Sequence, residues 1–215
     1  MTNQNTTSID NEIKNACEVL KNGGLILYPT DTVWGIGCDA TNSDAVARIY
    51  DWKQRCYSKA LIVLLADDNQ LHKYVDNVPD IAYELIDVAT KPLTIVYEKA
   101  RNLSPNLCAE DGSVGIRITK EEFSRRLCRS FRRPIVSTSA NISGTPTPKT
   151  FNAISKEIIC GVDYVIECRR NENANKQPSS VIKLSSNGII QILRPWLANH
   201  DNGCYMWQVI LSQPM

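Results

Sequence analysis

The sequence predicts an α/β protein with a single domain, in which helices flank one twisted, mixed β-sheet, and three observations support this fold class. Short apolar runs typical of buried strands alternate with stretches in which apolar residues recur at helical spacing. The length of 215 residues suits one domain, and no internal repeat divides the chain. Hydrophobic residues at 43% and charged residues at 22% are ordinary for globular proteins, so neither a disordered nor a fibrous chain is indicated.

The first elements follow from local pattern. Apolar residues at helical spacing from 9 to 20, ended by two glycines, predict a helix. The apolar run 25–28, followed by a proline, predicts a buried strand that leads into a polar loop. Residues 43–53 carry an apolar stripe and a capping Asn42 or Ser43, so a second helix is expected there.

The middle of the chain continues this alternation. Residues 60–66 are all apolar, which predicts a central strand. Helical patterns follow at 71–75 and 81–89, the second with a proline near its start, where this residue is tolerated. Apolar runs at 93–97 and 114–118 predict two further strands.

The last third contains helices, strands and a polar loop. Phenylalanine and leucine side chains spaced four residues apart predict a helix over 123–131, before a strand that ends in hydroxyl side chains. Polar residues 169–178 are expected to form a loop inside the domain rather than a domain boundary. We assign residues 9–195 to the domain and give the C-terminal extension 196–215 no predicted structure. The remaining predicted elements are strands at 134–139, 164–167, 180–184 and 189–194 and a helix at 151–159.

Composition excludes several classes of protein. The longest apolar run is far shorter than the roughly 20 residues of a membrane span, and the N-terminus lacks the order of a signal peptide, so we expect a cytoplasmic protein. Eight scattered cysteines without a C-x-x-C pair, and only two histidines, predict no metal site and indicate small buried hydrophobic side chains. A net charge of +1 argues against binding nucleic acid through bulk electrostatics.

Two segments imitate nucleotide-binding loops. Residues 35–40 fit G-x-G-x-x-A, but the glycines do not directly follow the strand and no acidic residue stands about twenty positions on, so a structural turn is expected. Residues 144–150 resemble a P-loop, but the second glycine is missing and two prolines have no N–H to donate to phosphate. Any bound nucleotide must therefore be held by side chains and other loops.

Cationic side chains gather near the end of the second helix, and hydroxyl or amide side chains gather at the end of strand 134–139. Cations neutralise phosphate charge, a guanidinium engages two oxygens, and hydroxyl or amide donors fix orientation, so the combination suits a triphosphate. Composition alone favours the other interpretation of the same residues, a solvated basic turn beside a Ser/Thr-rich loop. The residues are Lys53, Arg55 and Lys59 in the first group and Ser137, Ser139 and Asn141 in the second.

Several motifs, in this order and spacing, resemble the YrdC family of threonylcarbamoyl-adenylate synthases. Each motif is weak alone, but the combination is specific and the resemblance covers residues 9 to 195. The motifs are Tyr28-Pro-Thr-Asp-Thr-Val-Trp-Gly-Ile-Gly37, Lys53-Gln-Arg55, Ser113-Val-Gly-Ile-Arg117, Ser137-Thr-Ser-Ala-Asn-Ile-Ser-Gly144, Pro178-Ser-Ser-Val181 and Ile192-Leu-Arg194.

This resemblance implies an enzyme that combines L-threonine, bicarbonate and ATP, with Mg²⁺ accompanying ATP, into threonylcarbamoyl-adenylate and releases pyrophosphate. The product would pass to a separate tRNA threonylcarbamoyl transferase. Lys53 and Arg55 would support departure of pyrophosphate. By position, the threonine contacts would be Thr32, Arg117, Ser137 and Ser179. The ATP contacts would be Arg55, Lys59, Ser113, Ser139, Asn141, Thr147 and Arg194.

The sequence also departs from the family pattern. Trp34 stands where tyrosine is common, Ala60 where proline is common, and Leu64 where some members carry a histidine that contacts threonine. The last departure affects one substrate contact. The segment Lys91-Pro-Leu-Thr94 lacks the frequent Pro-Gly-Pro lead but retains its threonine.

Alternatives remain open at the level of sequence. Five arginines between 125 and 133 lie opposite the apolar stripe of their helix, so they form either a solvated outer face or a contact for double-stranded RNA, as in a translation-factor-like paralogue without synthase activity. Arg117 ends an otherwise apolar strand and needs an anionic partner. That partner would be either the threonine carboxylate or a protein carboxylate such as Glu121 or Glu122.

Overall fold

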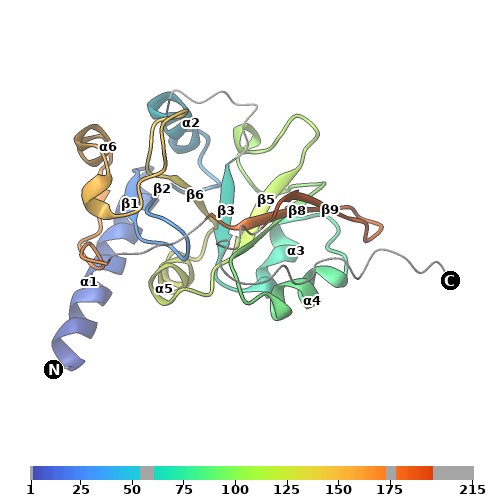
Figure 1. The fold of residues 1–215 in the computed structure, drawn as a ribbon, viewed down its shortest axis with the longest axis horizontal. Helices are drawn as coiled ribbons and strands as arrows, with labels where there is room; N and C mark the ends of the chain where they lie inside the picture. The colour runs from blue at the N-terminus through green and yellow to red at the C-terminus, as the bar shows by residue number, and fades with distance from the viewer. Residues whose placement is uncertain (1, 54–60, 173–177, 196–215) are drawn as a thin grey trace, which may run out of the picture.

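The computed structural model describes residues 2–53, 61–172 and 178–195, and the side chains from Ser8 onward within them (Figure 1). The strands are β1 (Ile26–Tyr28), β2 (Gly35–Gly37), β3 (Ile62–Leu65), β4 (Leu93–Tyr97), β5 (Val114–Ile118), β6 (Ile135–Ser139), β7 (Tyr164–Val165), β8 (Ser180–Leu184) and β9 (Ile190–Arg194). The helices are α1 (Thr2–Lys21), α2 (Ser43–Trp52), α3 (Leu71–Tyr74), α4 (Ile81–Val88), α5 (Glu122–Phe131) and α6 (Lys156–Gly161). Short 3₁₀ turns are η1 (Asp68–Gln70), η2 (Pro105–Leu107) and η3 (Phe151–Ala153).

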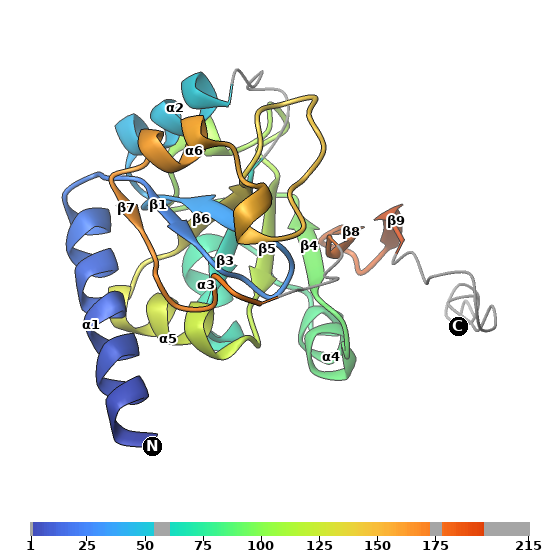
Figure 2. The same ribbon diagram turned by 60° about the vertical axis from the view of Figure 1, so that its left-hand side comes forward.

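The described strands form one mixed sheet in the order β7-β1-β2-β6-β3-β5-β4-β8-β9. The pairs β1–β7, β3–β5 and β4–β8 are parallel, and the other neighbouring pairs are antiparallel. Helices α2 and α6 lie on one side of the sheet, and α3, α4 and α5 lie on the other (Figures 1 and 2). The predicted fold class, a mixed sheet flanked by helices, is confirmed.

The central strands are buried on both faces because helices cover both sides of the sheet. Strand β3 pairs with β5 on one edge and with β6 on the other, which places Leu64 beside Arg117 and Ile62 beside Ser137. Strand β2 pairs with β6 so that Gly35 stands opposite Ser139. This order brings polar residues from distant parts of the chain to neighbouring positions.

Two predicted elements differ from the structure. The predicted turn over the two motif glycines is strand β2, whose residues are all buried. The predicted helix 151–159 is two elements, η3 and α6, because Ser155 adopts an extended backbone and its hydroxyl accepts a hydrogen bond from Ile158 N at 3.4 Å. Ser155 therefore begins a new helix as its cap instead of continuing the previous turn. The extension 196–215 lies outside the described residues.

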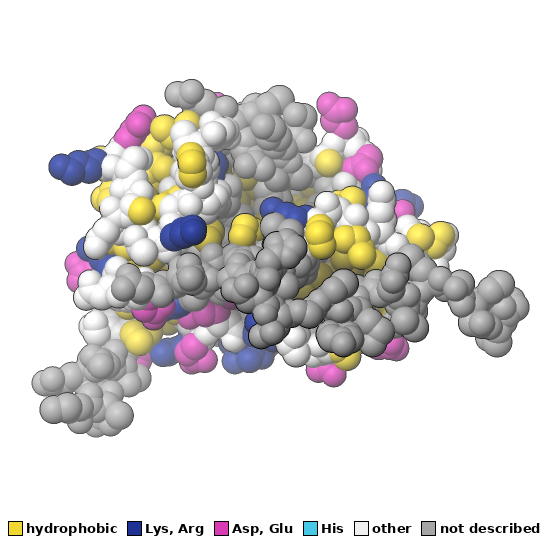
Figure 3. All heavy atoms as spheres, in the orientation of Figure 1, with side chains coloured by type: hydrophobic (Ala, Val, Ile, Leu, Met, Phe, Trp, Pro, Cys, Tyr) yellow, Lys and Arg dark blue, Asp and Glu magenta, His cyan; other side chains and the backbone are white. Residues whose placement is uncertain are grey.

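The three arginines of α5, and Arg133 just beyond it, form ion pairs with protein carboxylates. Arg125 and Arg129 each lie 2.8 Å from Asp67, and hydrogen bonds from Arg129 and then Arg125 lower the pKa of that carboxyl to about 2. Arg126 pairs with Asp10 of α1. Basic and acidic side chains are interspersed on the face shown in Figure 3. The outer face of α5 is therefore largely a set of ion pairs with the rest of the fold.

The cysteines of the described residues are all free thiols. Cys17, Cys38 and Cys128 are buried, as expected for small hydrophobic side chains, whereas Cys160 is exposed. Burial raises the pKa of the Cys38 and Cys128 thiols, which makes the reactive thiolate form unfavourable there. In the same part of the chain, no group of three or more metal-ligating side chains lies together. None of the described helices combines the length and apolar character needed to cross a membrane.

Candidate substrate site

The loop between β1 and β2 is held in a compact turn by its threonines. The Thr30 hydroxyl donates to the carbonyl of Val33 at 2.7 Å and accepts from the backbone N–H of Thr32 at 3.0 Å. Both threonines are buried. Hydroxyl-to-backbone bonds of this kind stabilise turns, so the loop presents Asp31 and Thr32 to the sheet in one fixed arrangement.

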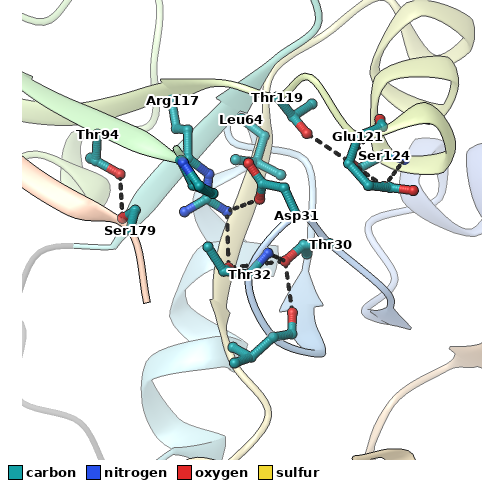
Figure 4. A network of polar contacts seen from close by, with 12 residues as sticks. Thr30, Asp31, Thr32, Leu64, Thr94, Arg117, Thr119, Glu121, Ser124 and Ser179 are labelled. Atoms are coloured by element: carbon teal, nitrogen blue, oxygen red, sulfur yellow. Dashed lines mark hydrogen bonds and ion pairs between the residues drawn. The ribbon is translucent and has the colours of Figure 1, made fainter. Parts of the chain in front are cut away.

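Arg117 of β5 meets this loop in the interior (Figure 4). Its side chain is only 3% exposed, and its Nη2 atom lies 3.0 Å from Oδ1 of Asp31 and 3.5 Å from the Thr32 hydroxyl. Burial of a guanidinium is costly unless it is paired, and Asp31 supplies the pairing charge. Among the described residues, Nε of Arg117 has no hydrogen-bond partner. The guanidinium is therefore held by the protein, and one of its buried donors is left without a hydrogen bond.

Arg117 pairs with a protein carboxylate, as the second alternative expected, but that carboxylate is Asp31 and not the suggested Glu121 or Glu122. Glu121 accepts hydrogen bonds from two backbone N–H groups at the start of α5, at 2.9 and 2.8 Å, and lies 2.6 Å from Arg169. A carboxylate that caps a helix and pairs with one arginine is already occupied.

Ser179 and Arg194 lie near Arg117, on the side of β4 and β8. The Ser179 and Thr94 hydroxyls are 2.8 Å apart, and Arg194 Nε donates to the carbonyl of Ser179 at 2.9 Å. Partial burial, and then repulsion from the positive charge of Arg117, lower the pKa of Arg194. An anionic ligand near them would relieve this repulsion.

A second group joins the end of α2 to the loop after β6. Lys53 is buried, its Nζ atom donates to the carbonyl of Ser139, and its own carbonyl accepts from Ser143 N at 3.1 Å. The Ser139 hydroxyl bonds to the side-chain oxygen of Asn141, whose amide donates to the carbonyl of Thr145 at 2.7 Å. Lys53, Ser139 and Asn141 therefore lie together where the end of α2 meets the loop after β6.

Other predicted site residues are placed less directly. Ser137 lies on β6, next to the strand that carries Leu64, and is buried near Gly35. Ser113 precedes β5, so it lies roughly 13 Å along the strand from Arg117, and its backbone N–H donates to Asp111 at 3.0 Å. Thr147 lies in the loop that contains Asn141. Arg55 and Lys59 lie outside the described residues.

The departures from the family pattern fall close to the site. Leu64 is paired with Arg117 in the parallel ladder and lies beside it (Figure 4), and its side chain has no hydrogen-bonding group to offer a ligand. Trp34 packs on Phe151 with ring centroids 4.9 Å apart. The latter ring in turn lies 4.8 Å from the guanidinium of Arg170. Trp34 therefore has a packing role between β2 and the 3₁₀ turn η3.

Sequence reasoning assigned no role to Asp31. A cavity of about 200 Å³ lies beside it, with walls that include Pro92, Leu93, Ile118 and Lys120. Two sequence features could have pointed to this residue. One is a single carboxylate between two threonines at the end of a buried strand, and the other is an arginine inside another apolar strand. These features show two charges that need partners, but they do not show that the two charges are partners of each other.

Comparison with known proteins gives consistent matches over most of the chain. A family model described as "Telomere recombination" (Sua5/YciO/YrdC) matches residues 18–195. A putative threonylcarbamoyl-AMP synthase of Methanocaldococcus jannaschii is 37% identical over 188 residues, which cover 85% of this chain and 87% of that protein. The threonylcarbamoyl-AMP synthase of Pseudoalteromonas translucida is 35% identical over 176 residues, covering 80% and 92% respectively.

Solved structures of Sua5 from P. abyssi have the same fold. A double variant of that protein superposes with a TM-score of 0.76 at 30% identity, covering 85% of this chain. A complex of Sua5 with L-threonine gives a TM-score of 0.70 at 28% identity, covering 80% of this chain. This chain spans only about half the length of those Sua5 chains, 56% and 50%. The matches confirm the resemblance seen in the sequence motifs, and the chain belongs to the Sua5/YciO/YrdC family.

Proposed function

We propose that this chain is a threonylcarbamoyl-AMP synthase, a nucleotidyltransferase that joins L-threonine, bicarbonate and ATP and releases pyrophosphate. The observation that carries the proposal is the buried guanidinium of Arg117, which is fixed by Asp31 beside the Thr32 hydroxyl and whose buried Nε has no hydrogen-bond partner among the described residues. Such a group suits the carboxylate of a small amino acid. Family membership, the names of the two curated relatives and the threonine complex of P. abyssi Sua5 support the same choice.

The chemistry requires two bond-forming steps. The amine nitrogen of threonine adds to the carbon of bicarbonate and water leaves, which gives a carbamate. A carbamate oxygen then attacks the α-phosphorus of ATP, and the bond to pyrophosphate breaks. Both steps join groups that are already bound, so catalysis by this chain would rest on positioning and on charge rather than on a covalent enzyme intermediate.

The two groups of polar residues would serve the two substrates. Arg117 would bind the threonine carboxylate while Thr32, Ser137 and Ser179 orient the other polar groups. The second group, with Lys53 and Arg55, would hold ATP and stabilise the departing pyrophosphate. Mg²⁺ would enter with ATP, because it is bound largely by phosphate oxygens and water, and would offset the same negative charge. The remaining proposed ATP contacts are Lys59, Ser113, Ser139, Asn141, Thr147 and Arg194.

Pyrophosphate release is expected to require threonine, bicarbonate and ATP together and not to require tRNA, because the proposed site handles only small molecules. The measurement is a coupled pyrophosphate assay in which each substrate is omitted in turn. Release that continues without threonine contradicts the proposal. We further propose that the product passes to a separate transferase that modifies tRNA and that the reaction takes place in the cytoplasm.

Arg55→Ala is expected to lower kcat/KM for ATP by about 10- to 150-fold, since a charged hydrogen bond is worth about 1.5 to 3 kcal/mol. This prediction comes from the Lys-x-Arg motif alone. Initial rates at varied ATP concentration measure it, and thermal unfolding shows whether the variant is folded. Kinetics equal to those of the wild type would remove Arg55 from the site.

Binding of double-stranded RNA is the alternative function. Ion pairs with protein carboxylates engage Arg125, Arg126, Arg129 and Arg133, so these charges are less available to phosphate than free arginines would be. We expect weak RNA binding. Filter binding of duplex RNA across a salt series measures this affinity. Submicromolar affinity with a steep salt dependence would favour the RNA-binding alternative.

A further inference from the structure

Asp31 is placed as a ligand-binding residue would be. Its side chain is 11% exposed, whereas the arginine with which it pairs is 3% exposed. The turn that carries it is anchored by two buried threonines, so its carboxylate is held in place before any ligand arrives. Asp31 also lines the cavity of about 200 Å³, together with Lys91, Lys120 and apolar side chains but without Arg117, so this cavity meets the ion pair from the Asp31 side.

The Arg117–Asp31 pair is not what a site for a plain anion would contain. A carboxylate 3.0 Å from the guanidinium repels an incoming anion and takes up one of the donors that would bind it. A zwitterion has no such conflict, because its carboxylate can face the guanidinium while its ammonium faces the aspartate. An α-amino acid carries both groups on one carbon, so the protein charges that recognise them must also be neighbours, as these two are.

We propose that Asp31 binds the α-ammonium group of the amino acid substrate while Arg117 binds its α-carboxylate. This inference rests on the proposed function and assigns a specificity residue within it. A site built this way rejects 2-deamino analogues, because loss of the ammonium removes the ligand's attraction to Asp31 while repulsion between Asp31 and the ligand carboxylate remains. It also accounts for a carboxylate within a turn that otherwise supplies only hydroxyl groups.

The test uses calorimetric titration with L-threonine, L-threoninol, which lacks the carboxylate, and 3-hydroxybutyrate, which lacks the ammonium. For the wild type, loss of the ammonium is expected to raise Kd by about 10- to 150-fold, the value of a charged hydrogen bond. Asp31→Asn is expected to weaken the binding of threonine and of threoninol by the same factor. The affinity of 3-hydroxybutyrate should change by less than about twofold or become tighter, because no ammonium–carboxylate contact is lost.

Asp67→Asn is the matched control, since it removes an aspartate that pairs with two arginines of α5 and takes no part in the site. All three affinities should stay within about twofold of the wild type in this variant. Thermal unfolding of both variants shows whether each is folded.

Two results would overturn the inference. Equal losses for threonine and 3-hydroxybutyrate in Asp31→Asn would mean that Asp31 acts only by orienting Arg117. Equal affinities of the wild type for threonine and 3-hydroxybutyrate would also overturn the inference. This second result needs no variant, so it remains decisive even if Asp31→Asn fails to fold. Failure of the wild type to bind threonine at all would instead contradict the proposed function.

Discussion

Replacement of Arg117 by lysine is expected to weaken threonine binding by about 10- to 150-fold and to change ATP binding far less. Lysine keeps the positive charge, but its ammonium is a point charge without the planar fork that can hold Asp31 and a ligand carboxylate together. In the structure, Nη2 already faces Asp31 and Thr32 while Nε has no partner among the described residues, so the ligand would use the part that lysine lacks. Calorimetric titration with threonine and with ATP measures both effects.

The control for this prediction is a measurement of whether the variant is folded. Arg117 is buried, so the unfolding midpoint of Arg117→Lys must be measured beside its affinities. ATP binding near the wild-type value shows that the second group of site residues is intact. Unchanged threonine affinity in a folded variant would leave Arg117 as the structural partner of Asp31 alone.

Replacement of Gly37 by alanine is expected to lower the free energy of unfolding by about 2 to 3 kcal/mol, because the added methyl group overpacks a filled interior. A Cβ at Gly37 would lie 2.7 Å from a ring carbon of Tyr28 and 2.8 Å from the carbonyl oxygen of Val136. The carbonyl belongs to β6 and the tyrosine ring is fully buried, so neither can move aside at small cost. Urea denaturation measures the loss as a lower midpoint at unchanged slope.

Gly35→Ala is the matched control on the same strand. Its added Cβ would meet its nearest neighbours, including Ser137 Oγ, at 3.3 to 3.4 Å, which calls for shifts of only a few tenths of an ångström. We expect a loss of about 1 kcal/mol or less. Equal losses at the two positions would show that close packing against Tyr28 and Val136 is not the reason for glycine in this motif.

The two glycines also show how far a short motif can be interpreted. Their spacing imitates a dinucleotide-binding loop, and the sequence context was sufficient to reject that interpretation. It was not sufficient to show a strand, because two glycines in three residues are disfavoured in strands by propensity. The reason for them lies in the approach of Tyr28 and β6 to this strand, which is a tertiary contact.

Local sequence pattern predicted secondary structure best in segments whose conformation does not depend on a single capping residue or on distant contacts. The apolar spacing of residues 123–131 corresponds to α5, and the runs at 93–97 and 114–118 correspond to β4 and β5 residue for residue. Pattern was weaker at 151–159, where the apolar spacing continues through Ser155 although its side chain caps a new helix. A cap is decided by the backbone conformation at one residue, which periodicity does not report.

The sequence by itself determined the alternation of strands and helices, the family, and the need of Arg117 for an anionic partner. Tertiary structure decided which partner it has. Glu121 is close to Arg117 along the chain, but it caps α5 and pairs with Arg169. Asp31 is distant along the chain and reaches Arg117 because the sheet order β2-β6-β3-β5 brings the β1–β2 loop to β5. A buried charge pairs with the opposite charge that the fold places within hydrogen-bonding distance. Strand order, and not separation along the sequence, determines which residue that is.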